Sequence, residues 1–245
     1  MLSWFLGAPA YSDPGEAAAL ASIDDRLTGS RLLDLGVGTG RTTGLVFDRC
    51  ATYLGIDVTP EMLVIAKDRY PDADLRLGDA RDLAAMCAPK SFDVAMFSFN
   101  GIDAVDHEGR VAIIDDVARV LAPGGTFVFS SLNINGHSFN ERPWQQPTVL
   151  DWLKVSRHPL RTAKGVQNYR RFHADEEDGP GWSRRLMRTH EFRFLVYFAS
   201  PAATVALVER AGFRVLGAWG WDGTAVDPTR DDINVDYIHY VFERA

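Results

Sequence analysis

The stretch LLDLGVGTGRTT, residues 32–43, is an apolar run that ends in three closely spaced glycines. The run from Arg31 to Leu35 predicts a buried strand, and residues 41–49 predict a helix directly after the glycines. Glycines at such a turn let the backbone bend sharply and approach a ligand, while the first turn of the helix offers free N–H donors. The stretch therefore predicts a ligand site between a strand and a helix.

An acidic residue at the end of the next strand narrows the kind of ligand. The run Thr52–Asp57 predicts a second strand, and Asp57 lies 21 residues after Gly36. A carboxylate there is placed to accept both hydroxyls of an adenosine ribose. Dinucleotide enzymes need a third glycine where Arg41 stands, and the chain contains no phosphate-binding G-x-x-x-x-G-K-[ST] motif. A dehydrogenase is therefore a remote alternative.

Strands and helices alternate along most of the chain. Further strands are predicted at residues 73–77, 92–97, 126–130, 213–219 and 237–242, with helices at 16–27, 59–69, 82–86, 107–121 and 201–211. Strands that are apolar throughout and are separated by helices are typical of a parallel sheet covered on both faces. We expect an α/β fold, Rossmann-like, with a seven-stranded, mostly parallel sheet, an antiparallel last strand, helices on both faces, and an insertion after strand five.

The order of these motifs resembles the class I S-adenosylmethionine-dependent methyltransferases over residues 16–131. The resemblance rests on the glycine loop, Asp57, Gly78-Asp79-Ala80, Ser91-Phe92-Asp93-Val94 and Leu121-Ala122-Pro123-Gly124-Gly125. It implies S-adenosylmethionine as cofactor, with the glycines under its methionine part, Asp57 at the ribose and Asp79 facing the adenine amino group. The expected cofactor-binding residues are Asp34, Gly36, Val37, Gly38, Gly40, Asp57, Val58, Met62, Asp79, Ala80, Ser98 and Phe99. Plain core packing remains an alternative role for Met62.

Composition limits the partners. The formal net charge of the chain is −7, whereas a protein that binds nucleic acid needs a basic surface. The segment after strand four, Ser98-Phe99-Asn100-Gly101, lacks both prolines of the [DNS]-P-P-[YFW] tetrad that the family uses on nucleic-acid amino groups. We therefore expect a small-molecule acceptor.

Other features of the chain argue against a metal site or disulfides, and against export or insertion into a membrane. The two cysteines, Cys50 and Cys87, show no zinc-ligand or disulfide spacing, and no set of clustered carboxylates predicts a metal. The apolar start of the chain breaks at Pro9, too early for a signal peptide or a membrane span. We expect a cytoplasmic protein, with residues 1–245 forming a single methyltransferase domain.

Residues 132–198 interrupt the alternation and are predicted to form an acceptor-binding insertion. They hold nine arginines and two lysines against seven acidic residues, together with Trp144, Trp152 and Trp182. A cationic, aromatic cover suits an anionic or aromatic acceptor, although a solvated arginine face and packed tryptophans would explain the same composition. Alternating residues at 167–173 and an extended pattern at 183–198, around a turn at 178–181, predict a β-hairpin.

The proposed reaction needs an aligned nucleophile and, for a hydroxyl acceptor, a base. His137 is the leading candidate because it follows strand five at the ligand edge of the sheet; His173 and His190 are second choices. Each of them could instead be structural or surface-exposed. The sequence thus predicts a methyltransferase acting on a small-molecule oxygen or nitrogen nucleophile, with a non-catalytic S-adenosylmethionine-binding protein of the same fold as the alternative.

Overall fold

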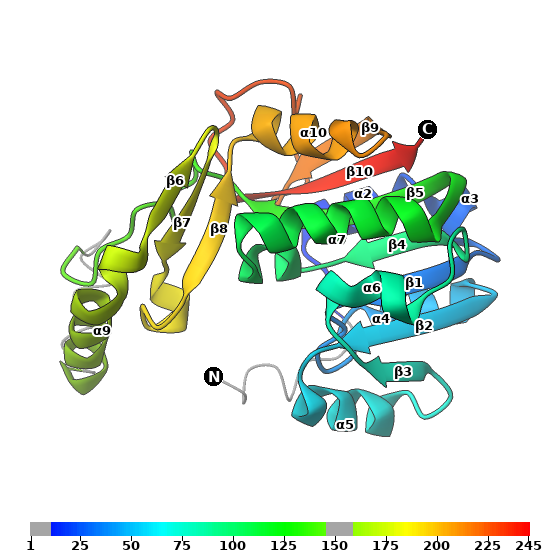
Figure 1. The fold of residues 1–245 in the computed structure, drawn as a ribbon, viewed down its shortest axis with the longest axis horizontal. Helices are drawn as coiled ribbons and strands as arrows, with labels where there is room; N and C mark the ends of the chain where they lie inside the picture. The colour runs from blue at the N-terminus through cyan, green and yellow to red at the C-terminus, as the bar shows by residue number, and fades with distance from the viewer. Residues whose placement is uncertain (1–10, 146–158) are drawn as a thin grey trace.

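The computed structural model describes residues 11–145 and 159–245, in which a seven-stranded sheet is covered by helices (Figure 1). From edge to edge the strands are β3 (Asp74–Leu77), β2 (Thr52–Asp57), β1 (Arg31–Leu35), β4 (Phe92–Phe97), β5 (Leu121–Leu132), β10 (Tyr237–Arg244) and β9 (Phe213–Gly220). β3, β2, β1, β4 and β5 pair in parallel, whereas β10 is antiparallel to both of its neighbours. The predicted fold class is confirmed.

Two apolar cores lie on the two faces of the sheet. Alternate residues of β1 show the division, because Leu33 and Leu35 face one core while Leu32 faces the other. The first core is covered by α6 (Leu83–Met86), α7 (His107–Val120) and α10 (Pro201–Arg210), and the second by α2 (Pro14–Ala21), α3 (Asp24–Leu27) and α4 (Thr43–Val46). α5 (Pro60–Arg69) contacts β2 and β3, at the sheet edge.

Several predicted helices are shorter than the sequence pattern suggested. The helix predicted at 16–27 is broken between α2 and α3, and the one at 41–49 becomes α4 followed by the 3₁₀ helix η1 (Phe47–Arg49). Likewise, η2 (Ala80–Asp82) and α6 replace the single short helix near residues 82–86. Asp13 caps α2, because its Oδ1 accepts from Glu16 N at 2.8 Å.

The insertion forms a separate small sheet beyond the end of the main sheet at which β1, β2 and β4 finish (Figure 1). Its antiparallel strands are β6 (Glu177–Gly179), β7 (Trp182–Leu186) and β8 (Leu195–Ala199), followed directly by α10. Three further 3₁₀ helices are η3 (Gly101–Ala104), η4 (His173–Asp175) and η5 (Arg188–His190).

The predicted hairpin is only partly right. The turn at residues 178–181 does connect β6 to β7. The prediction of an extended arm at 167–173 is wrong, because these residues belong to α9 (Pro159–Phe172) and η4. Tyr169 and Phe172 are three residues apart and therefore share a helical face, which packs in one cluster with Leu186 and Phe192.

Candidate active site

The glycine loop joins β1 to α4 at the carboxyl end of the strand. Gly36, Gly38 and Gly40 all have positive φ angles, of +67°, +58° and +83°. A Cβ atom on Gly36 would lie 2.7 Å from the Phe97 ring and one on Gly40 would lie 2.8 Å from the Tyr70 ring, whereas one on Gly38 would meet nothing closer than 4.0 Å. Two of the glycines therefore allow close packing, while Gly38 faces open space that a ligand can approach.

Asp57 ends β2 directly beside this loop. Its Oδ2 accepts a hydrogen bond from Gly38 N at 2.7 Å and its Oδ1 accepts one from Thr59 N, also at 2.7 Å. The residue is only 8% exposed. Two backbone donors thus fix the carboxylate, and each oxygen keeps a further lone pair that can accept a hydroxyl.

Asp34 lies fully buried on β1, two residues before the loop. Its Oδ2 accepts from Tyr53 Oη at 2.8 Å and from Thr42 Oγ at 3.2 Å, but its Oδ1 is buried with no hydrogen-bond partner among the described residues. Burial raises the pKa of Asp34 to about 6, although the bonds from Tyr53 and Thr42 oppose the rise. An orphaned, buried carboxylate oxygen at the root of the loop fits a ligand that brings a cationic donor, such as the ammonium group of a bound amino acid.

The residues predicted for the adenine side follow β2 and β3. Val58 is 65% exposed, and Met62, on α5, is half-buried. Asp79 caps η2, and hydrogen bonds from the Arg81 side chain hold the pKa of its carboxyl below the usual range. Ala80 begins η2. An exposed apolar side chain beside polar groups suits the face and edge of a purine, so this side of the loop also fits the cofactor.

The chain adopts an unusual conformation after β4. Phe99 and Asn100 both have positive φ angles, +54° and +58°, which are costly for residues other than glycine. Asn100 N donates to the buried Ser130 Oγ at 2.7 Å, and this bond holds the turn against β5. Half-buried Ser98 and the 41% exposed Phe99 are thereby presented at the carboxyl edge of the sheet. Strain of this kind is characteristic of functional sites.

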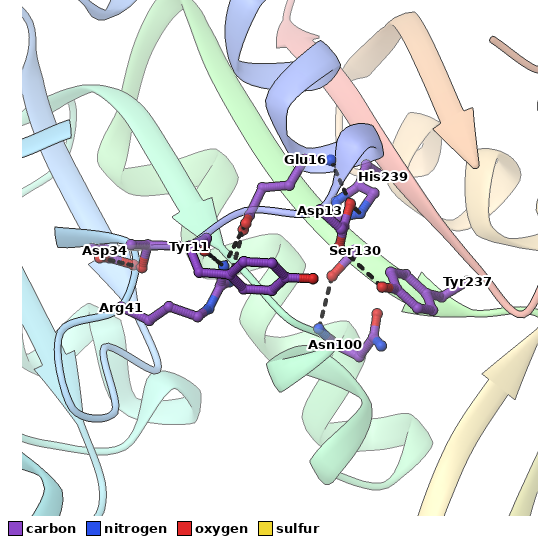
Figure 2. A network of polar contacts seen from close by, with 10 residues as sticks. Tyr11, Asp13, Glu16, Asp34, Arg41, Asn100, Ser130, Tyr237 and His239 are labelled. Atoms are coloured by element: carbon purple, nitrogen blue, oxygen red, sulfur yellow. Dashed lines mark hydrogen bonds and ion pairs between the residues drawn. The ribbon is translucent and has the colours of Figure 1, made fainter. Parts of the chain in front are cut away.

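Arg41, which replaces the third glycine, joins the loop to α2 (Figure 2). Its guanidinium forms two bonds to the Glu16 carboxylate, at 2.5 and 2.8 Å, and a third to the Tyr11 carbonyl oxygen. It also lies 5.0 Å above the centre of the Phe99 ring. The sequence marked Arg41 only as a departure from the dinucleotide motif, and no local pattern connected it to Glu16.

The start of α2 is connected in turn to β10. Asp13 Oδ2 accepts from Tyr237 Oη at 3.0 Å, and Asp13 Oδ1 lies 3.0 Å from Nε2 of the buried His239 (Figure 2). These contacts join residues more than 220 positions apart, so sequence reasoning missed them. They hold the N-terminal segment against the same edge of the sheet as the glycine loop.

A fully buried ion pair supports the β4 side of the site. Asp103 Oδ1 accepts from Arg110 Nη1 at 2.5 Å and from Ser131 Oγ at 2.8 Å, and Asp103 Oδ2 accepts from Leu132 N at 2.7 Å. Both charged side chains are 0% exposed. The network joins η3, α7 and the end of β5, and it too was missed, because Arg110 occurs in an ordinary amphipathic pattern.

The candidate histidines lie on three different segments. His137 is in an exposed turn after β5, and exposed His173 begins η4, where its Nδ1 lies 3.0 Å from the Tyr169 carbonyl oxygen. His190 packs on Phe194, with 4.3 Å between the ring centroids. Burial lowers the pKa of His190.

A fourth histidine, which the sequence did not single out, contacts the insertion. His107 Nδ1 lies 2.8 Å from Tyr197 Oη, and its ring stacks on Trp182 at 4.6 Å. Burial lowers the pKa of His107, and the nearby Arg110 lowers it further. Because Trp182 lies on β7 and Tyr197 on β8, this stack fixes the insertion sheet to the first turn of α7.

Other predictions concern metal binding, membrane spans and the insertion tryptophans, and the structure describes only part of the chain. Within residues 11–145 and 159–245, no three histidine, cysteine, aspartate or glutamate side chains form a group that could hold a metal ion. No helix in that part of the chain is long and apolar enough to cross a membrane. Trp152, one of the three insertion tryptophans, lies outside the described residues.

Comparison with known proteins agrees with this geometry. A family model described as "Methyltransferase domain" matches residues 32–125. The biotin biosynthesis bifunctional protein BioHC of Cellvibrio japonicus is 34% identical over 149 residues, which are 60% of this chain and 28% of that protein. A demethylmenaquinone methyltransferase of Paenarthrobacter aurescens is 34% identical over 109 residues, 44% of this chain and 41% of that protein. The chain thus matches less than half the length of these two relatives.

The fold also matches a solved structure. An S-adenosylmethionine-dependent methyltransferase from Mesorhizobium loti superimposes with a TM-score of 0.61 and 17% identity, covering 93% of this chain and 98% of that one. The family model spans the glycine loop, Asp57, Asp79 and the β4 turn, and the fold continues to the antiparallel β10. Residues 32–125 thus resemble a methyltransferase domain, and the fold of the chain is that of a solved S-adenosylmethionine-dependent methyltransferase.

Proposed function

We propose that this chain is an enzyme that transfers the methyl group of S-adenosylmethionine to an oxygen or nitrogen atom of a small molecule. The observation that carries the proposal is the Asp57 carboxylate, held by Gly38 N and Thr59 N at the open glycine loop. The bound cofactor supplies an electrophilic methyl group. The work left to the protein is to hold both reactants in line and to exclude competing nucleophiles.

The donor half of the site is assigned to residues around the glycine loop. Asp57 accepts the ribose hydroxyls through its remaining lone pairs, and Asp34 Oδ1 receives the ammonium group of the methionine part. The other proposed cofactor contacts are Gly36, Val37, Gly38, Gly40, Val58, Met62, Asp79, Ala80, Ser98 and Phe99. The buried orphan at Asp34 and the open space above Gly38 support this assignment.

The acceptor half is assigned to the β4 turn and the insertion, residues 132–198, of a single methyltransferase domain. A small, anionic or aromatic acceptor is the proposed partner. If it presents a hydroxyl, His137 is the proposed general base and His173 the second choice, since a positioned histidine takes up a proton near neutral pH. The exposure of both side chains is compatible with that role.

Replacing Asp57 by alanine tests the donor half. We expect Asp57→Ala to weaken S-adenosylmethionine binding more than tenfold, because hydrogen bonds to a charged group contribute about 1.5–3 kcal/mol. Isothermal titration calorimetry of the full chain gives the affinity. Asp82→Ala is the matched control, because Asp82 is exposed and lies on the same side of the sheet's edge, in η2. Equal affinities for the two variants would contradict the assignment.

Turnover separates the enzyme from a non-catalytic binding protein. Small hydroxyl and amine compounds are incubated with methyl-labelled S-adenosylmethionine, and methylated product is read by mass. Release of S-adenosylhomocysteine together with a labelled product supports the enzyme. Tight cofactor binding without any product across the collection would favour the binding protein.

A further inference from the structure

A cavity of about 350 Å³ lies where the insertion meets the β4 side of the main domain. Ala104, the last residue of η3, lines it from the main domain, and Arg184 and Leu186 line it from β7. Ala104 follows the strained turn at Phe99–Asn100 by a few residues, so the cavity borders the segment that carries the β4 side of the site. Its volume is within the range of small-molecule sites.

The walls of the cavity combine flat apolar surfaces with positive charge. Phe172 and Phe194 provide aromatic surface, while Arg184 and Arg193 provide two guanidinium groups against one carboxylate, Asp175. The lining is thus cationic, although the chain as a whole is acidic. Such a combination favours a ligand with a ring and an anionic group.

Arg184 shows an unmet requirement for a hydrogen-bond acceptor. Its side chain is 18% exposed, and Nη1 donates to Glu177 Oε1 at 3.0 Å. Its Nε is buried and has no hydrogen-bond partner in the part of the chain that the structure describes. The bond to Glu177 uses one of the five N–H groups of this guanidinium, and the Arg184 side chain lines the cavity. A carboxylate can bind a guanidinium through two oxygens at once.

We infer that this cavity binds the methyl acceptor and that the acceptor is a planar aromatic carboxylate. Arg184 binds the carboxylate, with Arg193 adding charge at the more exposed side, and Phe172 and Phe194 contact the ring. The nucleophilic atom then lies on the opposite side of the ring, toward Ala104 and the β4 turn. This assignment rests on the proposed function and adds the chemical class of the acceptor.

Direct binding tests the inference without requiring the true substrate. The probes are 4-hydroxybenzoate and 4-aminobenzoate, which pair a carboxylate with an oxygen or nitrogen nucleophile, and their uncharged methyl esters. The full chain is first saturated with S-adenosylhomocysteine, and each probe is then titrated by calorimetry. We expect at least one acid to bind at least ten times more tightly than its ester.

Variants assign the preference to the cavity. Arg184→Met keeps the length and apolar stem of the side chain and is expected to abolish the preference for the acid. Glu177→Gln removes the ion-pair partner of Arg184 and is expected to retain the preference, which shows that the guanidinium is not merely structural. Arg214→Met is the matched control, because Arg214 pairs with Glu243 on the far edge of the main sheet. Thermal melting checks that each variant is folded.

The outcomes distinguish a failure of the proposed function from a failure of the aromatic-carboxylate assignment. If S-adenosylhomocysteine does not bind the unmodified chain, the proposed function fails first. If it binds, then equal affinities for acid and ester, no binding of either acid, or an unchanged preference in Arg184→Met overturns the aromatic-carboxylate assignment alone. An acid preference that Arg184→Met removes and Arg214→Met keeps supports it.

Discussion

Replacing Arg110 leaves the buried Asp103 carboxylate without a counter-charge, close to the turn that follows β4. In the native chain the Asp103 carboxylate accepts from Arg110 Nη1, Ser131 Oγ and Leu132 N, with both charged residues fully buried. Arg110→Met preserves the volume of the side-chain stem but leaves the carboxylate without a counter-charge. Breaking a buried pair in this way costs about 3–5 kcal/mol of unfolding free energy. The cation–π contact of Arg110 with Tyr197, 4.7 Å from guanidinium to ring centre, is lost as well.

The loss should depend on pH in a defined direction. Burial raises the pKa of Asp103 to about 6, and the positive charge of Arg110 opposes that rise. Without Arg110 the pKa of the folded variant lies higher still. A group whose pKa is raised on folding stabilises the protein only while it is protonated, so stability falls as pH rises through the folded pKa. The penalty of Arg110→Met is therefore expected to be larger at pH 8 than at pH 6.

Urea unfolding at pH 6 and pH 8 measures the penalty. Arg76→Met is the control, because the pair between Arg76 and Asp74 is about half exposed and should be worth less than about 1 kcal/mol. The double variant Asp103→Asn with Arg110→Met removes the isolated charge and should recover part of the loss at pH 8. A loss below about 1 kcal/mol at pH 8, or one that does not change with pH, would refute the reasoning.

Two further predictions concern histidines. If the acceptor is a hydroxyl, His137→Ala should lower kcat about 100-fold or more while cofactor affinity is retained; unchanged turnover with an identified acceptor would remove His137 from the mechanism. For His107, burial lowers the pKa in the folded state below the usual 6.5, and the charge of Arg110 lowers it further. The neutral ring, stacked on Trp182, therefore contributes to the free energy of unfolding above pH 6.5, and this contribution is lost as the pH falls through the folded pKa. The melting temperature of the native chain should therefore exceed that of His107→Gln more at pH 7.5 than at pH 5.5, and an advantage equal at both pH values would contradict this.

Features encoded by neighbouring residues could be predicted from the sequence. β1, β2 and β4 begin and end at the predicted residues, because each is an apolar run followed by residues that break a strand. Asp57 was placed correctly at the end of β2 for the same reason. Helix lengths were less predictable: a periodic pattern does not show where tertiary packing interrupts a helix, as it does between α2 and α3.

The insertion shows why a pattern of alternation can mislead. Tyr169, Arg171 and His173 alternate with other residues as a strand would, but Tyr169 and His173 are also one helical turn apart. In the structure their rings stack, with 5.4 Å between centroids, at the end of α9. In the folded chain Phe192, 23 positions further along, packs edge-on against Tyr169, a contact that the local pattern does not contain. Short polar segments carry too few apolar positions to decide between helix and strand.

The proposed donor and acceptor halves of the site also differ in how far apart in the sequence their contacting residues lie. The donor half depends on residues close in sequence, since Gly38 and Asp57 are 19 positions apart and lie within the single unit formed by β1, α4 and β2. Its chemistry was therefore predictable from a motif. The proposed acceptor half depends on Asp103 meeting Ser131 and on β8 packing against η3, contacts between distant segments that no short motif encodes. Arg184 is an example: its residue type was visible in the sequence, but only the fold makes it line a cavity together with Ala104. On the proposed assignment, the identity of the acceptor is to be sought through the insertion cavity, and the glycine loop gives no information about it.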